Sequence, residues 1–331
     1  MLLRQSTFIL LTALLMFNSC KKSGNSASPT VYSAGYWGNG NYSVAAYWVN
    51  SRLFSLTDTT HDAVAVAICA AGNDVYVAGT VGSMTNGLSN MATWWKNGQA
   101  FQLGTTGASA ATAIAVSAGN VYVAGEDRSY PVYWRNGEEV MLQGGYPSSY
   151  AMSIAVSGND VYVVGMDSVK NPCYWKNGQL MELPGLFTQA SAIAVSGNDV
   201  YVAGQQVDTV SGNWAAILWT NGTPSILSAP PYGANAGAIA IDGADVYIGG
   251  NVNLASAAWE NGQLIPMPAT PSYKLYTWSI GVANGKAYVG GNALSLGTNW
   301  TSEAAYWSAD GLVILDKDPD QASNVWGIFV Q

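Results

Sequence analysis

Short apolar runs alternate with polar turns along the chain from about residue 31 onward. The clearest run is Val-Tyr-Val-Ala-Gly, and it or a close variant recurs at 75–79, 121–125, 161–165, 200–204, 246–250 and 287–291. Runs of four to seven residues rich in Val, Ile, Tyr and Trp are typical of β-strands. The pattern therefore predicts many short strands joined by tight turns.

Seven tryptophans recur at intervals of 39 to 48 residues: Trp48, Trp95, Trp134, Trp175, Trp219, Trp259 and Trp307. Five of them are followed by an x-Asn-Gly turn, as in Trp175-Lys176-Asn177-Gly178. Asn-Gly between two strands is a strong hairpin signal, because both central residues of a type I′ turn need positive φ. A strand-rich repeat of about 40–50 residues indicates a β-propeller.

Each repeat contains four predicted strands. The first is typified by Ala192-Ile193-Ala194-Val195, the second is the Val-Tyr-Val-Ala-Gly run, the third ends in the tryptophan, and the fourth follows the Asn-Gly turn. Such a four-stranded antiparallel meander is one propeller blade. Small residues recur in the first strand at Ala67, Ala115, Ala155, Ala194, Ala240, Gly281 and Gly327. We expect these and the Tyr and Trp columns to pack the core.

Six complete repeats run from about residue 63 to residue 320, and a fragment remains at each end. Residues 324–330 match a first strand, whereas the segment from Val31 to Leu56 matches second, third and fourth strands. Pairing the two fragments would remove exposed sheet edges. The sequence thus predicts an all-β, seven-bladed propeller of four-stranded antiparallel blades, closed by a composite blade, as one domain over 30–331.

Composition narrows the possible functions. The 331 residues are 49% hydrophobic and only 10% charged, with a net charge of −8 and a single histidine. Without a basic patch the chain cannot neutralise phosphates, so we expect no nucleic-acid partner. Cys69 and Cys173 lie in different repeats, so we expect two buried free thiols and no zinc site. No cofactor is expected.

The first 19 residues have the layout of a signal peptide: Arg4, an apolar run from Phe8 to Phe17, then Asn18-Ser19 before Cys20. This layout resembles a bacterial lipobox, although Phe17 and Asn18 replace the usual Leu and Ala or Ser. The resemblance implies that Cys20 is lipidated and that the protein is anchored to the outer membrane, on either side. An ordinary secretory signal is the alternative. Residues 20–29 read as a flexible tether.

The segment ATWWKNGQAFQLGTTG at 92–107, followed by Ala113-Ile114-Ala115-Val116 and the 121–125 run, resembles the bacterial HAF-type extracellular repeat. The likeness extends repeat by repeat over nearly the whole chain after the tether. The histidine of that repeat is absent throughout, and its Ala-Phe appears as Ala-Tyr or similar. The resemblance implies a secreted repeat protein and no particular chemistry.

Loops that vary between repeats are where a rigid scaffold tends to bind ligands. The connections after the second and fourth strands vary and share one face. Aromatic residues there are candidates for gripping a glycan or protein partner: Tyr146, Tyr150, Phe187, Tyr232, Tyr273 and Tyr276. The alternative is that they pack between neighbouring blades.

Acidic residues gather in two successive connections of the same face. Asp316, Asp318 and Asp320 lie in one, and Asp58 and Asp62 flank His61 in the next. Alternate oxygen ligands suit calcium, but Pro319 interrupts the run, and a solvated acidic rim is the simpler interpretation. The leading functional hypothesis is a non-enzymatic, lipid-anchored binding module of the cell envelope. The alternative is a glycan-acting hydrolase or lyase that uses acidic residues at the channel mouth.

Overall fold

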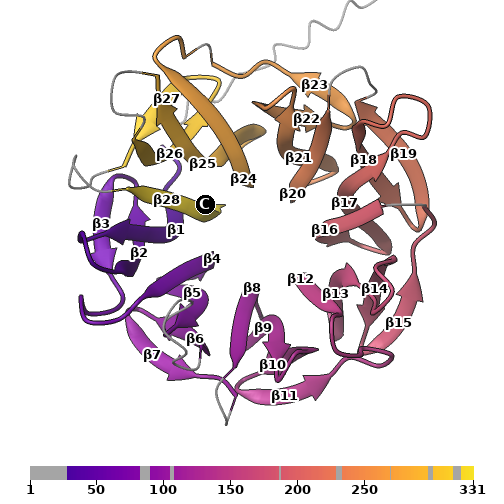
Figure 1. The fold of residues 1–331 in the computed structure, drawn as a ribbon, viewed down its shortest axis with the longest axis horizontal. Helices are drawn as coiled ribbons and strands as arrows, with labels where there is room; N and C mark the ends of the chain where they lie inside the picture. Colours follow the sequence, from indigo (N-terminus) through magenta and orange to yellow (C-terminus); the bar gives the residue numbers. More distant parts are fainter. Residues whose placement is uncertain are drawn as a thin grey trace, which may run out of the picture.

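A computed structural model describes residues 28–82, 90–104, 108–185, 188–228, 233–268, 270–296, 301–315 and 322–331. Seven four-stranded antiparallel sheets are arranged in a ring around a central axis (Figure 1). This confirms the predicted seven-bladed propeller. In the described part of the chain, no helix is long and apolar enough to cross a membrane.

The first two strands of each blade lie nearest the axis in Figure 1. The innermost strands are β28 (Ser323–Val330), β4 (Ala63–Ala71), β8 (Ser109–Ser117), β12 (Tyr150–Ser157), β16 (Thr188–Ser196), β20 (Ala234–Asp242) and β24 (Tyr273–Ala283). The second strands are β1 (Val31–Gly38), β5 (Asp74–Val81), β9 (Asn120–Asp127), β13 (Asp160–Met166), β17 (Asp199–Val207), β21 (Asp245–Val252) and β25 (Lys286–Ser295).

The third and fourth strands complete each blade toward the rim. The third strands are β2 (Ser43–Val49), β6 (Met91–Lys96), β10 (Tyr130–Arg135), β14 (Pro172–Lys176), β18 (Trp214–Thr220), β22 (Ala255–Glu260) and β26 (Ser302–Ser308). The fourth strands are β3 (Arg52–Ser55), β7 (Gln99–Gln102), β11 (Glu138–Met141), β15 (Gln179–Glu182), β19 (Thr223–Ser228), β23 (Gln263–Ile265) and β27 (Gly311–Ile314). We number the continuous blades 1 (β4–β7) to 6 (β24–β27).

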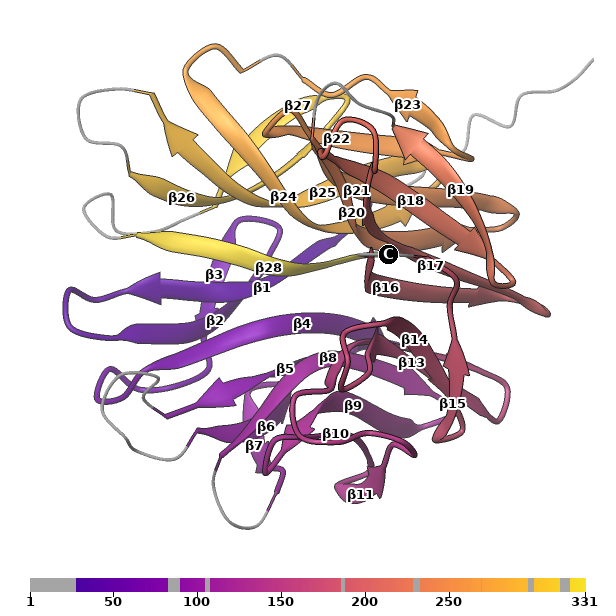
Figure 2. The same cartoon turned by 45° about the vertical axis from the view of Figure 1, so that its right-hand side comes forward.

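The composite blade joins the two ends of the chain. Strand β28 pairs with β1 from Val31 opposite Val330 to Trp37 opposite Ser323, and the two strands lie side by side in Figures 1 and 2. Thr30 N donates to Gln331 O at 2.8 Å, and Gln331 N donates back to Thr30 O at 3.1 Å. The predicted closure is confirmed, with β28 innermost.

Every innermost strand carries a β-bulge, which lies in the N-terminal half of the strand or, in β24, at its middle. One residue in each ladder has no partner: Val66, Thr112, Met152, Ser191, Gly237, Trp278 and Trp326. We call these seven residues the bulge ring. A bulge leaves its extra residue outside the regular alternation of the strand and re-aims the side chain.

The glycine of the Val-Tyr-Val-Ala-Gly run faces this bulge. A Cβ atom on Gly165 would lie 1.7 Å from Tyr150 O, and one on Gly79 would lie 2.0 Å from Val64 O. The corresponding glycines of the other five blades would place a Cβ atom between 1.8 and 2.0 Å from a backbone carbonyl oxygen. The glycine therefore recurs because only a residue without a side chain fits beside the backbone carbonyl two residues before the unpaired one.

The observed register differs in two blades from the predicted column of small residues in the first strand. In five blades the column residue lies opposite the second-strand tyrosine, as Ala155 lies opposite Tyr162. In the other two, Cys69 faces Tyr76 and Phe329 faces Tyr32, so Ala67 and Gly327 lie two residues away from the expected register. A shift of two residues keeps a side chain on the same face of a strand, so small size alone did not reveal the error.

The seven regularly spaced tryptophans are buried, with 0 to 1% of each residue exposed. Each packs with the preceding blade; Trp175 of blade 3, for example, lies in one apolar cluster with Tyr133 and Leu142 of blade 2. Trp175 Nε1 donates to Gln143 O, and Trp219 Nε1 donates to Pro184 O, both at 2.9 Å. The prediction that these tryptophans are wedges in the core is confirmed.

The turns after the first and third strands share one face, which we call the turn face. In blade 3, Asn177 has a φ of 51°, its Oδ1 accepts from Val161 N at 2.9 Å, and its Nδ2 donates to Asp160 Oδ1 at 2.8 Å. The same asparagine clamp occurs at Asn97, Asn136, Asn221 and Asn261. The Asn-Gly turn thus also holds the neighbouring turn of its own blade.

The two cysteines are free thiols, as expected. Cys173 is buried, whereas Cys69 is only half-buried. The expectation that both thiols are buried is therefore wrong for Cys69. Burial raises the pKa of the Cys69 thiol to about 12 and raises that of Cys173 as well. Both thiols are therefore protonated and weakly nucleophilic at neutral pH.

Candidate ligand-binding site at the channel mouth

The ends of the strands opposite the turn face form the loop face, where the variable connections begin and end. All seven members of the bulge ring line one cavity of 400 Å³ at this end of the channel. Ala111, Gln205, Asn235, Ala236, Asn251 and Thr277 complete its lining. We call it the channel-mouth cavity. Its volume lies within the range of about 300–1,000 Å³ typical of small-ligand pockets.

Two tryptophans form the aromatic part of this cavity. The rings of Trp278 and Trp326 have centroids 5.0 Å apart and are tilted by 45°. Trp278 is 43% exposed although it belongs to an inner strand. Its Nε1 donates to Asn292 Oδ1 at 2.7 Å, and Asn292 Nδ2 donates to Ser302 Oγ at 3.1 Å. The Trp278 indole is therefore fixed at its polar edge while part of its surface faces the cavity.

Amide and hydroxyl groups form the polar part. Asn251 Oδ1 accepts from Thr277 N at 3.0 Å, which ties blade 5 to blade 6. Asn235 Oδ1 accepts from Asn251 N at 3.1 Å, and Gln205 Nε2 donates to Gln189 Oε1 at 2.6 Å. Thr112 Oγ1 donates to Ala151 O of blade 3 at 2.9 Å. Several of these groups are positioned by bonds between strands or blades rather than by a ligand.

No ionisable side chain is among the residues that line the channel-mouth cavity. The chain as a whole carries a net charge of −8. A charged ligand group in this cavity would lose water without gaining an opposite charge, and burying an unpaired charge is costly. The lining therefore favours a neutral ligand.

A second cavity of 570 Å³ adjoins the first and shares Val66, Ala111 and Trp326 with it. Tyr36 contributes an aromatic ring from the composite blade, and burial raises the pKa of its hydroxyl. Two carboxylates line this cavity. Asp62 Oδ1 accepts from Ser43 N at 2.8 Å, and Glu126 is half-buried. Among the described residues, these two carboxylates line the cavity that adjoins the channel mouth.

The predicted aromatic residues that the structure describes do not share a cavity. Tyr146 is 63% exposed, and Tyr150, the first residue of β12, lies beneath Lys170, whose Nζ is 4.0 Å from the ring centroid. Tyr273 and Tyr276 lie within β24 rather than in a loop. Tyr273 lines a separate pocket of 260 Å³, and burial is the main cause that raises the pKa of its hydroxyl. Phe187 and Tyr232 lie outside the described residues.

The predicted acidic cluster is only partly described. Asp316, Asp318 and Asp320 lie outside the described residues, as does Cys20. Thr60 Oγ1 donates to Asp58 Oδ1 at 2.6 Å, and this bond is the largest cause that lowers the pKa of Asp58. His61 Nδ1 lies 2.6 Å from the same hydroxyl oxygen. Among the residues described, no group of three or more His, Cys, Asp or Glu side chains is arranged to hold a metal ion.

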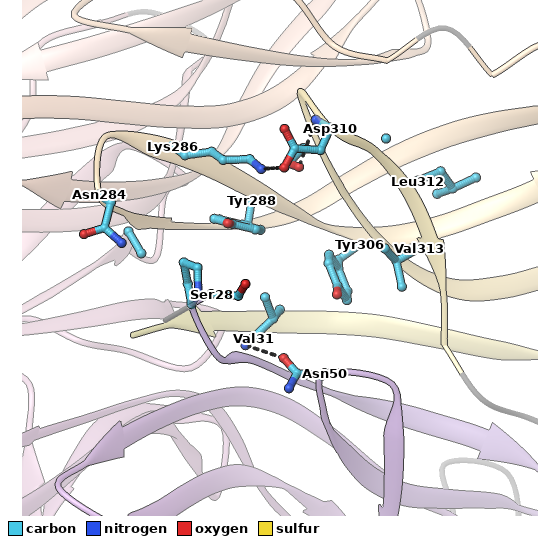
Figure 3. A pocket seen from close by; sticks show the side chains of 14 residues that line it. Ser28, Val31, Asn50, Asn284, Lys286, Tyr288, Tyr306, Asp310, Leu312 and Val313 are labelled. Atoms are coloured by element: carbon cyan, nitrogen blue, oxygen red, sulfur yellow. Dashed lines mark hydrogen bonds and ion pairs between the residues drawn. The ribbon is translucent and has the colours of Figure 1, made fainter. Parts of the chain in front are cut away.

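A third cavity, of 610 Å³, opens on the turn face between blade 6 and the composite blade. Figure 3 shows Tyr288 and Tyr306 on its blade 6 side and Ser28, Val31 and Asn50 on the other, with the ion pair of Lys286 and Asp310 nearby. Burial raises the pKa of both tyrosines. No turn joins β28 to β1 here, because these strands come from opposite ends of the chain. The cavity therefore marks where the chain enters the ring.

Comparisons with known proteins support the fold. The β-propeller domain of the trilobed protease from Pyrococcus furiosus matches with a TM-score of 0.51 and 10% identity, over 77% of this chain and 86% of that one. An acylaminoacyl peptidase from Pyrococcus horikoshii matches with a TM-score of 0.50 and 12% identity over 77% of this chain. This match spans 46% of the length of the peptidase. At such identities the likeness shows the propeller fold alone.

The comparisons add no family. No protein-family model matches the chain, and no curated protein matches it. The resemblance to the HAF-type repeat therefore stays a prediction. The trilobed protease domain is described as having an open velcro topology, whereas in the present chain β28 pairs with β1.

The bulge ring is the part of the site that the sequence prediction missed. The signal in the sequence emerges only when the innermost strands are aligned on the bulge, because Trp278 and Trp326 then occupy one position, directly before Ser279 and Gly327. Two blades have tryptophan at this repeat position, and the other five have Val, Thr, Met, Ser and Gly. A position that accepts side chains of such different size is not restricted by packing in the core.

Proposed function

We propose that this protein is a non-enzymatic binding module of the bacterial cell envelope, anchored through a lipid on Cys20, that holds a glycan or protein partner on its loop face. The observation that carries the proposal is the channel-mouth cavity, to which every blade contributes one bulge residue. The backbone geometry repeats seven times while the side chain at the bulge differs. That combination of constant scaffold and variable contact is typical of a recognition surface.

The path of the chain supports an anchored arrangement. Ser28 and Pro29 line the cavity on the turn face, so β1 begins on that face. Cys20 precedes Ser28 by eight residues, which span at most about 28 Å when extended. A lipid on Cys20 would therefore keep the turn face near the membrane and leave the loop face toward potential partners.

The proposal is tested with a purified chain that begins at Ser28. We expect binding on a glycan array, or capture of a protein from the cell envelope, that falls at least tenfold in Ser191→Trp, where a large side chain fills the channel-mouth cavity. Thr223→Trp on the turn face is the matched control and should bind as the parent does. Clean negatives for the parent chain in both assays would refute the binding role.

The second cavity supports one other function. Asp62 and Glu126 provide two carboxylates beside Trp326, and paired carboxylates are the catalytic groups of most glycoside hydrolases. If the protein is such an enzyme, it should release reducing ends from envelope polysaccharides. Both Glu126→Gln and Asp62→Asn should abolish this release, while the turn-face variant Thr223→Trp, outside both cavities, retains it. Absence of any release by the parent chain would leave the binding role.

A further inference from the structure

We propose that the channel-mouth cavity holds a neutral hexopyranose residue, stacked on the exposed face of Trp278. This inference rests on the proposed binding function and specifies the ligand. It uses four properties of the cavity: a fixed aromatic surface, surrounding neutral hydrogen-bonding groups, the absence of charge in the lining and a restricted volume.

The aromatic surface is already positioned for stacking. Asn292 holds the Nε1 edge of Trp278 at 2.7 Å, and Trp326 packs at a centroid distance of 5.0 Å. Because the only polar atom of the indole is satisfied, the exposed part of the ring offers an apolar face with negative quadrupole charge. The C–H groups on one face of a pyranose are the complementary surface. No ordering of the Trp278 ring has to accompany binding, which favours affinity.

The polar groups complement hydroxyls. Ser191 and Thr112 present hydroxyl groups, each able to donate one hydrogen bond and accept two, and the oxygen of Thr112 can still accept after donating to Ala151 O. Asn235 Oδ1 is used by Asn251, and within the described residues its Nδ2 is the group left to donate toward a ligand. Sugar hydroxyls both donate and accept, so they match this mixture.

The absence of ionisable groups from the lining favours neutral sugars over acidic sugars. A uronic or sialic acid would bring a carboxylate into a cavity lined by no Lys, Arg or His, in a protein of net charge −8. The terminus of a peptide would likewise meet no opposite charge in this lining. An uncharged hexose avoids both costs. A volume of 400 Å³ suits one or two sugar residues rather than a folded partner.

The test titrates the chain beginning at Ser28 with methyl glycosides of glucose, galactose, mannose and N-acetylglucosamine, and with glucuronic acid. Calorimetry and saturation-transfer NMR give affinity and contact. We expect at least one neutral glycoside to bind, and glucuronic acid to bind at least tenfold more weakly. Trp278→Ala should lower the affinity at least tenfold, and Trp278→Phe should lower it less, because a smaller ring remains.

Tyr130→Ala is the matched control, since it removes an exposed aromatic side chain at the loop-face end of β10, outside the cavity. It should leave affinity unchanged. If Trp278→Ala fails to fold, Ser191→Arg gives the same test by filling the cavity while Trp278 stays in place. Equal affinity in these cavity variants, or equal binding of glucuronic acid, would overturn the inference.

Failure of this inference is distinguishable from failure of the proposed function. If no neutral glycoside binds but an acidic glycan or a protein does, and Ser191→Trp blocks that binding, the hexopyranose is wrong and the binding role stands. If the glycoside panel, the glycan array and the envelope capture are all negative, both are wrong.

Discussion

The two faces of the propeller are made from the ends of the same strands, yet they use their residues in opposite ways. On the turn face, five blades repeat one asparagine clamp with the same atoms and nearly the same distances. On the loop face, the bulge position carries Val, Thr, Met, Ser, Gly or Trp in different blades. One face is constant in sequence, and the other is constant only in backbone shape.

The difference shows how a repeat can vary without losing its fold. The bulge needs a glycine in the neighbouring strand, and each of the seven blades provides it. The bulged residue itself lines the channel-mouth cavity, where Met152 and Trp278 are 45% and 43% exposed. The backbone shape of the bulge thus depends on the second-strand glycine, and the side chain at the bulge position can vary with the ligand.

Loss of ring closure should have the largest effect. Deleting residues 322–331 removes β28 and exposes the edge of β1, so the melting temperature should fall by about 10 °C or more. A chain that begins at Ser28 keeps all 28 described strands and should melt as the full chain does. Differential scanning calorimetry measures both. An unchanged melt in the deletion would contradict the role of the composite blade.

The glycines of the two faces should differ in what they tolerate. Gly165→Ala places a Cβ atom 1.7 Å from Tyr150 O, and should cost about 4 kcal/mol or more because the bulge must rearrange. Gly158→Ala, at a turn with a φ of 59° and open space around the site, should cost only about 1–2 kcal/mol. Urea unfolding compares them, and equal costs would show that the bulge does not explain the second-strand glycine.

Removing one clamp should have a moderate effect. Asn177→Gly keeps the left-handed backbone but loses the bonds to Val161 N and Asp160, and should destabilise blade 3 by roughly 1–3 kcal/mol. Asn253→Gly changes a loop-face residue of similar φ, 51°, outside the clamps, and serves as the control. Urea unfolding should show the greater loss for Asn177→Gly. Equal losses would mean that the clamp adds nothing beyond turn conformation.

A change in the bulge ring should have the smallest effect on stability. Met152 is 45% exposed, so Met152→Ala should change the free energy of unfolding by less than about 1 kcal/mol. Its buried neighbour in β12 gives the contrast, because Ile154→Ala should cost about 2–5 kcal/mol. The same urea titration measures both. A large loss for Met152→Ala would show that the bulge ring is part of the core.

Much of the fold could be predicted because each propeller blade needs the same residue types at the same positions. The tryptophan spacing, the Asn-Gly turns and the complementary ends gave the number of blades and the composite blade. The bulges could not be located in the same way, because Ala65, Ala67 and Cys69 are all small and sheet alternation repeats every two residues. The channel-mouth cavity was not predicted for the same reason. Trp278 and Trp326 share a repeat position only when their strands are aligned on the bulge.

The pairing of β28 with β1 also imposes an order in time. The hydrogen bond between Gln331 and Tyr32 joins residues 299 positions apart. At a synthesis rate of about 5–20 residues per second, roughly 15–60 s pass between the appearance of these two residues. During that interval the edge of β1 lacks its neighbour, and an unpaired strand edge is a template for pairing with another chain.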